Sequence, residues 1–489
     1  MKLNIIIHKI GHHKWKSAAI SILAILILSW VGILIYISQF NNRQLTDFHT
    51  FTEFWEAKGE SVDADDFFTS IDSTPSETSK LADLHQHPAF LDEVANKHTP
   101  KLPHVDYLDI KGLNNDFHFL SHEQNNAGRK PDYITDIDQW LDAHTSNLSE
   151  KQTAIQILLL LKPLEARLDG ISEASKRPSA TYNNPLTNSE DAMNTHGLEI
   201  KLNTLFTTRA VLRALAGKPQ KSLDDLSAAI RICKHSESAA SLLGAVPTTI
   251  SYSTITSSVR IILATHTLTP ETLKNLDTQL TTLNPQAFLL TALRGEIACF
   301  CTEIRKLIHP SNESASLSED YSFHAKLKYI IPTQWGNALE EYKISKAPAA
   351  YLIHLQLGDI QSIANNVLYS KNTRATTLSP TQIQWIHRQA QFQEADGYHG
   401  ILTAIIPTHA DFQNMRAAIA IERYRLKHNH LPPALTDLVP KLKKKIPTDL
   451  YTGTPLHYKT LPDGSFLLYS TGPDQIDNAG DNDSDDIIW

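Results

Sequence analysis

Six aspartates crowd the end of the chain, between Asp474 and Asp486, and no Lys or Arg lies among them. Calcium takes about six to eight oxygen ligands from carboxylates, carbonyls and water, and it tolerates irregular loops. Without a cation, six carboxylates within thirteen residues would repel one another. The residue types and their spacing therefore predict a bound, structural calcium ion (Ca2+) in this loop.

Two alternatives compete with that interpretation. The run 481–485 begins like an EF-hand loop, but Asp486 stands where such a loop needs glycine, and the chain ends before the twelfth position. A solvated acidic tail is the second alternative, because runs of like charge are usually solvated. The apolar residues Ile487 to Trp489 argue against a solvated tail, since a strand or plug that closes a loop needs them.

The longest apolar run lies near the N-terminus, where Ser17–Ile37 contains twenty-one residues without a charge. A helix needs about 20 apolar residues to cross a bilayer core, whereas a signal-peptide core has only about 7–15. Four lysines precede the run, so the positive-inside rule places the N-terminus in the cytoplasm. We therefore expect a basic cytoplasmic segment at 1–16 and an uncleaved transmembrane helix at 17–38, with the lipid bilayer as its partner. The protein would be a single-pass inner-membrane protein whose bulk is extracytoplasmic.

The middle of the chain has a helical pattern. Residues 39–150 are polar and irregular, and they lead into an α-helical domain at 151–400, in which the apolar run 154–168 predicts a buried helix. Gly217 ends one helix, and the next carries Asp224–Asp225 in its first turn, where acidic residues suit the helix dipole. The unit ALAGKPQKSLDDLSAAI weakly resembles a tetratricopeptide-type repeat, and an ordinary helical hairpin explains it equally well.

The residues 405–489 predict a small α+β domain. A helix with one apolar face is expected up to His428, where the following prolines stop it. Two extended runs follow at 456–460 and 466–470. The sequence Pro-Asp-Gly at 462–464 lies between them and predicts an antiparallel β-hairpin.

Four segments of this domain follow one another in a specific order: IERYRLKHNHLPPALTDLVP, IPTDLYTGTPLHY, the hairpin, and LYSTGPD…DDIIW. This order resembles the C-terminal globular domain of the major pseudopilins of type II secretion systems. In that family the acidic C-terminal loop binds calcium, and the matching ligand positions here are Ser470, Asp474 and Asp486. The remaining aspartates of the loop are further candidate ligands: Asp477, Asp481, Asp483 and Asp485. Processing and polymerisation as a pilin are not expected, because no glutamate lies early in the apolar run.

No residue of the sequence is nominated for catalysis. The signatures of serine hydrolases, zinc hydrolases, P-loop enzymes and dinucleotide-binding enzymes do not occur in it. Three close histidine pairs supply two potential metal ligands each, and none has a third: His85 with His87, His118 with His122, and His428 with His430. The three cysteines show no metal-binding spacing, so we expect them to be buried and to pack as small apolar side chains.

The composition leaves two functions open. A net charge of −8 argues against a nucleic-acid partner, which would need a basic face. The first hypothesis is a membrane-anchored, non-enzymatic envelope scaffold or binding protein with an envelope protein as partner, linked to type II secretion through its pseudopilin-like module. The alternative is an envelope hydrolase whose active site lies among the helices. A polar, concave cluster of His, Asp, Glu or Ser would favour the hydrolase.

Overall fold

The computed structural model is mainly helical and contains a small three-stranded antiparallel sheet. The residues that it describes are 2–71, 79–80, 148–162, 165–177, 180–181, 189–237, 241–308, 347–370, 373–392, 398–440, 442–443 and 445–489. Of the polar segment 39–150, residues 72–78 and 81–147 lie outside these ranges, and with the second stretch two of the three histidine pairs.

The helices are α1 (Lys2–Ala57), α2 (Ala64–Ile71), α6 (Glu150–Leu160), α7 (Glu165–Ala174), α8 (Ser189–Leu215), α9 (Pro219–Ser236), α10 (Leu242–Ala264), α11 (Pro270–Leu280), α12 (Pro285–Ile308), α15 (Ala347–Ile363), the π-helix η7 (Ala364–Leu368), α16 (Pro380–Phe392), α17 (Tyr398–His428) and the 3-10 helix η8 (Leu435–Leu438). The strands are β1 (Ser79–Lys80), β2 (Ala180–Thr181), β3 (Tyr369–Ser370), β4 (Thr373–Arg374), β5 (His457–Thr460), β6 (Phe466–Ser470) and β7 (Ile487–Ile488).

Two compact units make up the chain. Unit 1 comprises Met1–Asp63 and Ile297–Ser362, and unit 2 comprises Ala64–Glu296 and Ile363–Trp489. Within unit 1, the end of α1 packs on the second half of α12, where the rings of Phe48 and Phe300 meet edge to face at 6.1 Å.

The predicted membrane-spanning helix needs correction. Residues 17–38 lie inside α1, which continues as one helix through the ion pair of Arg43 and Asp47 to Ala57. A membrane span needs about 20 apolar residues. Within the described ranges, no helix is both long enough and apolar enough to meet that requirement. The transmembrane element of the predicted fold class is therefore wrong, and so is the inner-membrane localisation that rested on it.

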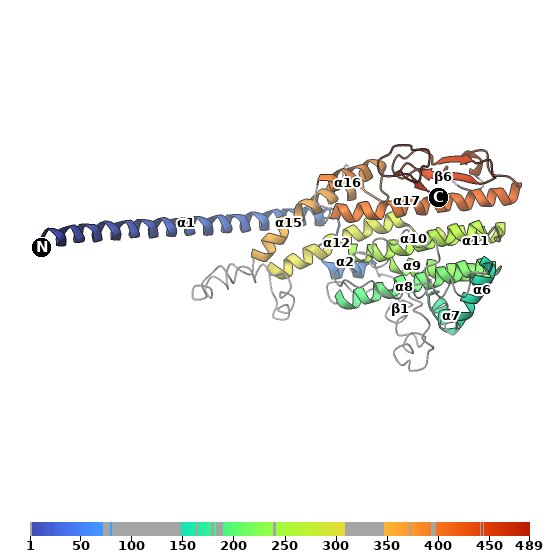
Figure 1. Ribbon diagram of the computed structural model, residues 1–489, viewed down its shortest axis with the longest axis horizontal. Helices are drawn as coiled ribbons and strands as arrows, with labels where there is room; N and C mark the ends of the chain where they lie inside the picture. Colours follow the sequence, from blue (N-terminus) through green and yellow to red (C-terminus); the bar gives the residue numbers. More distant parts are fainter. Residues whose placement is uncertain are drawn as a thin grey trace. The chain divides into compact units, whose positions relative to one another are not determined.

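Unit 2 is a stack of helices that ends in a sheet. Along this stack, α6 contacts α8, α8 contacts both α9 and α10, α10 contacts α17, and α17 carries β6 and β7 (Figure 1). The buried side chains of the stack are mostly Leu, Ile and Ala, which recur at the helical spacing expected from the sequence. All three cysteines are buried and free, so their predicted role as small apolar residues is confirmed.

A tight turn joins α8 to α9 and sets the angle of this hairpin. Gly217 has a φ of +76°, a backbone conformation in which a residue with a Cβ atom would be strained. Pro219 then occupies the first turn of α9, where its missing N–H costs nothing. The predicted stop at Gly217 is confirmed, and it brings the start of α9 back beside the end of α8.

The C-terminal hairpin is also confirmed. Strand β5 pairs with β6 in antiparallel register, with Tyr458 opposite Leu468, and Gly464 supplies the positive φ of the turn. The third strand, β7, pairs with the other edge of β6. The predicted end of the preceding helix at His428 agrees with the observed end of α17.

The apolar C-terminus closes this sheet against the helices. Asn414 of α17 donates to the carbonyl of Ile487 at 2.9 Å. Arg260 of α10 donates to the carbonyl of Ile488 at 3.2 Å, pairs with Asp411 at 3.0 Å and lies over the ring of Trp489 at 4.8 Å. The end of the chain is thus held by two different helices.

Candidate functional site

Several aspartates of the C-terminal loop accept hydrogen bonds from backbone amides of the same loop. Asp474, Asp477 and Asp481 each accept a hydrogen bond from the backbone amide two residues later, at 2.9, 2.9 and 3.1 Å. Asp486 accepts the amide of Gly480 at 2.9 Å. Such side-chain-to-backbone turns are a standard use of aspartate in loops. They satisfy Asp474, Asp477 and Asp481 locally and spread them along the loop, whereas Oδ1 of the buried Asp486 has no hydrogen-bond partner.

The predicted calcium site therefore needs correction. Over the described residues, no three His, Cys, Asp or Glu side chains are grouped so that they could hold a metal ion. Asp483 and Asp485 point to solvent, whereas Ser470 is buried in β6 and donates to Asp449 at 2.8 Å. The predicted convergence of these carboxylates on one ion is not found, because they serve separate turns instead.

Asp449 is a buried carboxylate for which the sequence analysis predicted no role. It is 1% exposed and accepts four hydrogen bonds. Its Oδ1 accepts the Tyr451 amide at 2.7 Å and the Ser470 hydroxyl, while its Oδ2 accepts the amide and hydroxyl of Thr471 at 2.9 and 2.8 Å. Asp449 thus ties the segment before β5 to the end of β6, which is a structural role.

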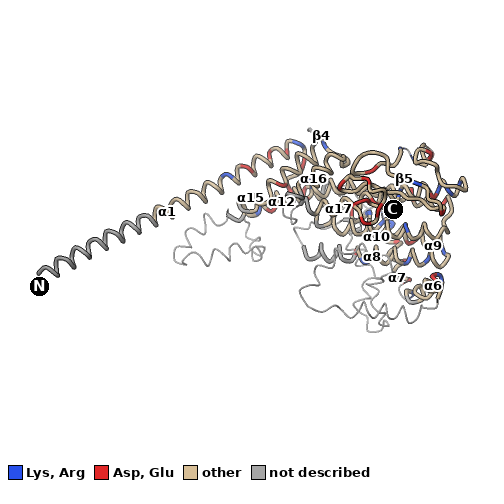
Figure 2. The backbone as a smooth tube through the Cα atoms, turned by 45° about the horizontal axis from the view of Figure 1, so that its top comes forward, with Lys and Arg blue, Asp and Glu red and all other residues tan. Residues whose placement is uncertain are grey.

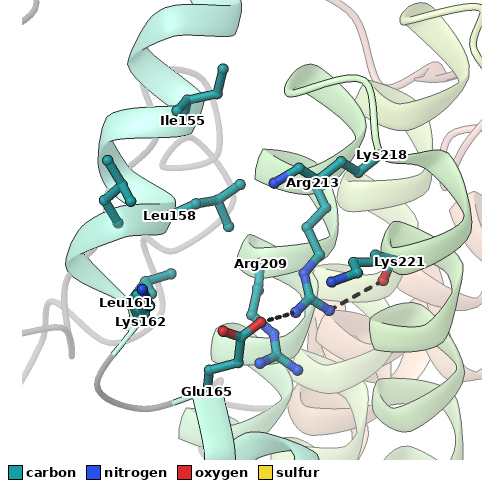
Figure 3. Close-up of a pocket in the computed structure, with 10 residues that line it drawn as sticks. Ile155, Leu158, Leu161, Lys162, Glu165, Arg209, Arg213, Lys218 and Lys221 are labelled. Atoms are coloured by element: carbon teal, nitrogen blue, oxygen red, sulfur yellow. Dashed lines mark hydrogen bonds and ion pairs between the residues drawn. The ribbon is translucent and has the colours of Figure 1, made fainter.

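A cationic pocket lies between the α6–α7 pair and the α8–α9 hairpin of unit 2 (Figure 3). It has a volume of about 270 Å³ and is partly open to solvent. The lining residues are Ile155, Leu158, Leu159, Leu161, Lys162, Glu165, Arg209, Arg213, Lys218 and Lys221. We call this site the cationic pocket because five of these side chains are Lys or Arg.

One wall of the cationic pocket is apolar. Helix α6 buries Ala154, Ile157 and Leu161 against α8, which leaves its neighbouring face uncovered. Ile155 and Leu159 lie on that face and are 37% and 55% exposed. The expectation that the whole run 154–168 is buried is therefore wrong, and the uncovered part lines the cationic pocket.

The opposite wall holds a buried ion-pair network centred on Asp225. Its Oδ1 accepts Nη2 of Arg209 at 2.5 Å, and its Oδ2 accepts Nη1 of Arg213 at 2.7 Å. The two arginines also reach Asp169, which is exposed, at 3.4 Å and Glu165, which is partly exposed, at 3.3 Å. Figure 3 shows Arg209 and Arg213 extending from α8 toward Glu165.

Cations outnumber carboxylates in the lining of the cationic pocket. Lys162, Lys218 and Lys221 are exposed at the pocket, and none of them forms an ion pair with a carboxylate of the described residues. The Arg209 side chain is 3% exposed, yet its Nη1 has no hydrogen-bond partner. A buried donor without an acceptor costs about 1–3 kcal/mol, and more when it is charged. The pocket is therefore chemically suited to an anion.

Comparisons with protein-family models, curated proteins and solved structures found no match to this chain. The resemblances of its C-terminal domain to major pseudopilins and of its middle to tetratricopeptide-type repeats consequently stay predictions.

The central residue of the cationic pocket lies elsewhere in its helix than expected from the sequence. Asp225 is predicted in a first helical turn, but α9 begins at Pro219, and Asp225 faces α8 with 1% exposure. Burial raises the pKa of Asp225 to about 6, although the positive charges of Arg209 and Arg213 act in the opposite direction. A signal was present in the sequence, since the two arginines are four residues apart and therefore share one face of a helix.

A second group of buried polar side chains surrounds Glu237 at the end of α9. Its carboxylate accepts the hydroxyl of Tyr252 and the amide of Asn284, the latter at 3.1 Å, and it pairs with Lys234. Burial raises the pKa of Tyr252 well above its usual value. Three donors on one carboxylate hold α9, α10 and the start of α12 together, so this group is structural.

The remaining histidine pair packs against one aromatic ring. The rings of His428 and His430 lie 6.0 Å apart and both pack on Tyr424. The cationic pocket is consequently the best-supported functional site in the described part of the chain.

Proposed function

We propose that unit 2 is a non-enzymatic scaffold whose cationic pocket binds an acidic segment of a partner protein. The segment would combine carboxylates with one large apolar side chain. The carboxylates match the lysines and arginines, and the apolar side chain matches the wall formed by Ile155 and Leu159.

One observation carries this proposal, namely the unpartnered Nη1 of Arg209. A guanidinium usually places its donors on carboxylate oxygens, and this one already shares Asp225 with Arg213. This donor is buried within Arg209, a residue that lines the pocket together with three lysines that have no ion pair with a carboxylate of the described residues. An incoming carboxylate would balance this excess charge, and it would satisfy the donor once the Arg209 side chain turns toward it.

The lining chemistry favours binding over hydrolysis. A hydrolytic site needs a nucleophile beside a general base, or a metal-bound water. The lining of the cationic pocket contains Glu165 but no Ser, Cys or His, and Glu165 is already paired with Arg213 at 3.3 Å. The pocket thus lacks the combination that the hydrolase hypothesis requires.

Reversing two charges at the rim should weaken binding of an acidic peptide. We expect Lys218→Glu combined with Lys221→Glu to raise the Kd of the fluorescein-labelled pentapeptide EDIED by at least about tenfold, because two attractive charges become repulsive. Replacing the isoleucine of the peptide with serine should weaken binding to the unaltered chain as well. Fluorescence anisotropy with the full-length chain measures both effects.

Lys274→Glu is the matched control for the rim variant, since Lys274 is an exposed lysine on α11 with only a surface ion pair. It should bind EDIED as the unaltered chain does. Equal affinities for the rim variant and the control would refute the proposed site, and the absence of any EDIED binding to the unaltered chain would refute the proposed function.

Acidification should strengthen EDIED binding. Below a pH of about 6, Asp225 becomes protonated while Arg209 and Arg213 keep their charge, so the cationic pocket gains one net positive charge. Peptide carboxylates with a pKa of about 4 stay ionised at a pH of about 5. We therefore expect the Kd to fall by several-fold between neutral pH and a pH of about 5, as measured by anisotropy.

Asp225→Asn is the control for this pH effect, because its side chain cannot titrate. It should bind EDIED with an affinity that changes little over the same range, and circular dichroism must show that the variant remains folded. If binding weakened on acidification, the assignment of Asp225 as the titrating group would be incorrect.

A further inference from the structure

Unit 2 leaves few large apolar side chains exposed. Across its described residues they are Ile155, Leu159 and Ile476. The first two form the apolar wall of the cationic pocket, and the third lies in the acidic C-terminal loop with 59% exposure. Exposed apolar groups framed by polar ones are typical of interaction surfaces.

The surroundings of Ile476 are strongly acidic. Asp474 and Asp477 flank it, and the hydrogen bond from the Ile476 amide to Asp474 fixes the turn that presents its side chain. Exposed Asp481, Asp483 and further acids follow along the same loop, and no Lys or Arg occurs between residue 474 and the C-terminus. Figure 2 shows these acidic residues gathered near the C-terminus. The loop therefore presents one exposed apolar side chain between exposed carboxylates.

The loop and the cationic pocket lie at opposite ends of the stack in unit 2. The pocket is formed by α6, α7, α8 and α9, while the loop connects β6 to β7 on the far side of α17 (Figure 1). Helix α10 lies between α8 and α17, with contacts to both. The loop of a folded chain consequently cannot enter its own pocket, so a loop that occupies the pocket must come from another molecule.

We propose that the acidic loop 474–486 of one copy docks in the cationic pocket of a second copy, with Ile476 as its apolar contact. This inference rests on the proposed function of the pocket and names its occupant. The Ile476 side chain would cover Ile155 and Leu159, and carboxylates of the loop would face Lys162, Lys218 and Lys221. A carboxylate that reaches the base of the pocket would accept the vacant Arg209 donor.

The geometry of this contact predicts growth beyond a dimer. Two different surfaces meet, so a pair joined through a single contact retains one free loop and one free pocket. Head-to-tail contacts of this kind produce either rings or open chains, depending on the rotation between neighbouring copies. The mass of the assembly should therefore increase with protein concentration instead of stopping at two copies.

Sedimentation velocity of the full-length chain over a range of concentrations tests this inference. At low ionic strength we expect the mean mass to rise past that of a dimer, and at about 0.5 M NaCl to fall toward the monomer, because salt screens exposed charges. Ile476→Arg, which removes the apolar group of the loop, should be monomeric. Lys218→Glu combined with Lys221→Glu, which disables the pocket, should be monomeric too.

Mixing the two variants provides the decisive measurement. The Ile476→Arg chain keeps an intact pocket, and the double lysine variant keeps an intact loop. An equimolar mixture should form a 1:1 dimer and nothing larger, because each dimer has only disabled surfaces left. This outcome also shows that both variants are folded. Lys274→Glu and Leu355→Arg, which alter an exposed lysine and an exposed leucine elsewhere, should assemble as the unaltered chain does.

The outcomes separate this inference from the proposed function. A chain that binds EDIED in its pocket but stays monomeric at every concentration keeps the proposed function and overturns the second copy as occupant. Assembly that persists in both disabled variants, or a mixture that yields no dimer, also overturns the inference. A chain that neither binds EDIED nor assembles overturns both.

Discussion

Replacing Asp225 with alanine is expected to lower the free energy of unfolding by about 3–5 kcal/mol. The change leaves Arg209 and Arg213, whose side chains are 3% and 8% exposed, without the carboxylate that they share. Two buried positive charges then face each other with only the exposed Asp169 and the partly exposed Glu165 nearby. Urea-induced unfolding of the full-length chain at neutral pH, where Asp225 is ionised, measures this loss.

Asp224→Ala is the matched control, because Asp224 is the neighbouring residue on α9 and is exposed. Its side chain accepts only a long hydrogen bond of 3.4 Å from Gln220. We expect this change to lower the free energy of unfolding by less than about 0.5 kcal/mol. Similar losses for the two variants would mean that the buried network around Asp225 does not stabilise the α8–α9 hairpin as the distances indicate.

A loss of similar size, about 3–5 kcal/mol, is expected when Asp449 is replaced with alanine. Four donors from Tyr451, Ser470 and Thr471 lose their acceptor, and all of these groups are buried. The effect should concentrate in the C-terminal sheet. Faster hydrogen exchange of the Tyr451 and Thr471 amides, together with the urea midpoint, measures it.

Two comparisons sharpen the Asp449 result. Asp449→Asn keeps one carbonyl acceptor and the size of the side chain. It should therefore lower the free energy of unfolding by less than Asp449→Ala does. Asp483→Ala removes an exposed carboxylate of the acidic loop and should have little effect. If Asp483→Ala proved as costly as Asp449→Ala, the buried carboxylate would not be the main stabilising group of this sheet.

Local sequence signals predicted several boundaries of the fold correctly. Gly217 with the following proline marked the α8–α9 turn, and the Pro-Asp-Gly sequence at 462–464 marked the hairpin between β5 and β6. These signals work because the backbone preference of one or two residues decides the local conformation. The apolar run 154–168 was harder, because a nearly continuous run does not show which face of α6 packs on α8.

The cationic pocket could not be read in the same way. Its network joins Arg213 to Glu165 and to Asp225, which lie 48 and 12 residues away along the chain. Spacing within one helix shows that Arg209 and Arg213 share a face, but it does not show what that face meets. The calcium site was predicted for a related reason. The composition of the loop gives the number of carboxylates, but it does not show that Asp474, Asp477 and Asp481 each accept a hydrogen bond from a nearby backbone amide.

Helix α17 is buried all around between Ala417 and Ile421, because α10 and α11 cover one side and the sheet with η8 covers another. A helix in this position contributes to the cores of both the helical stack and the sheet. Cutting the chain ahead of α17 would strip the helical stack of one layer and leave the released sheet with a bare apolar flank. The secondary structure thus changes from helices to a sheet at α17, but the chain cannot be divided there into two parts that could be replaced independently.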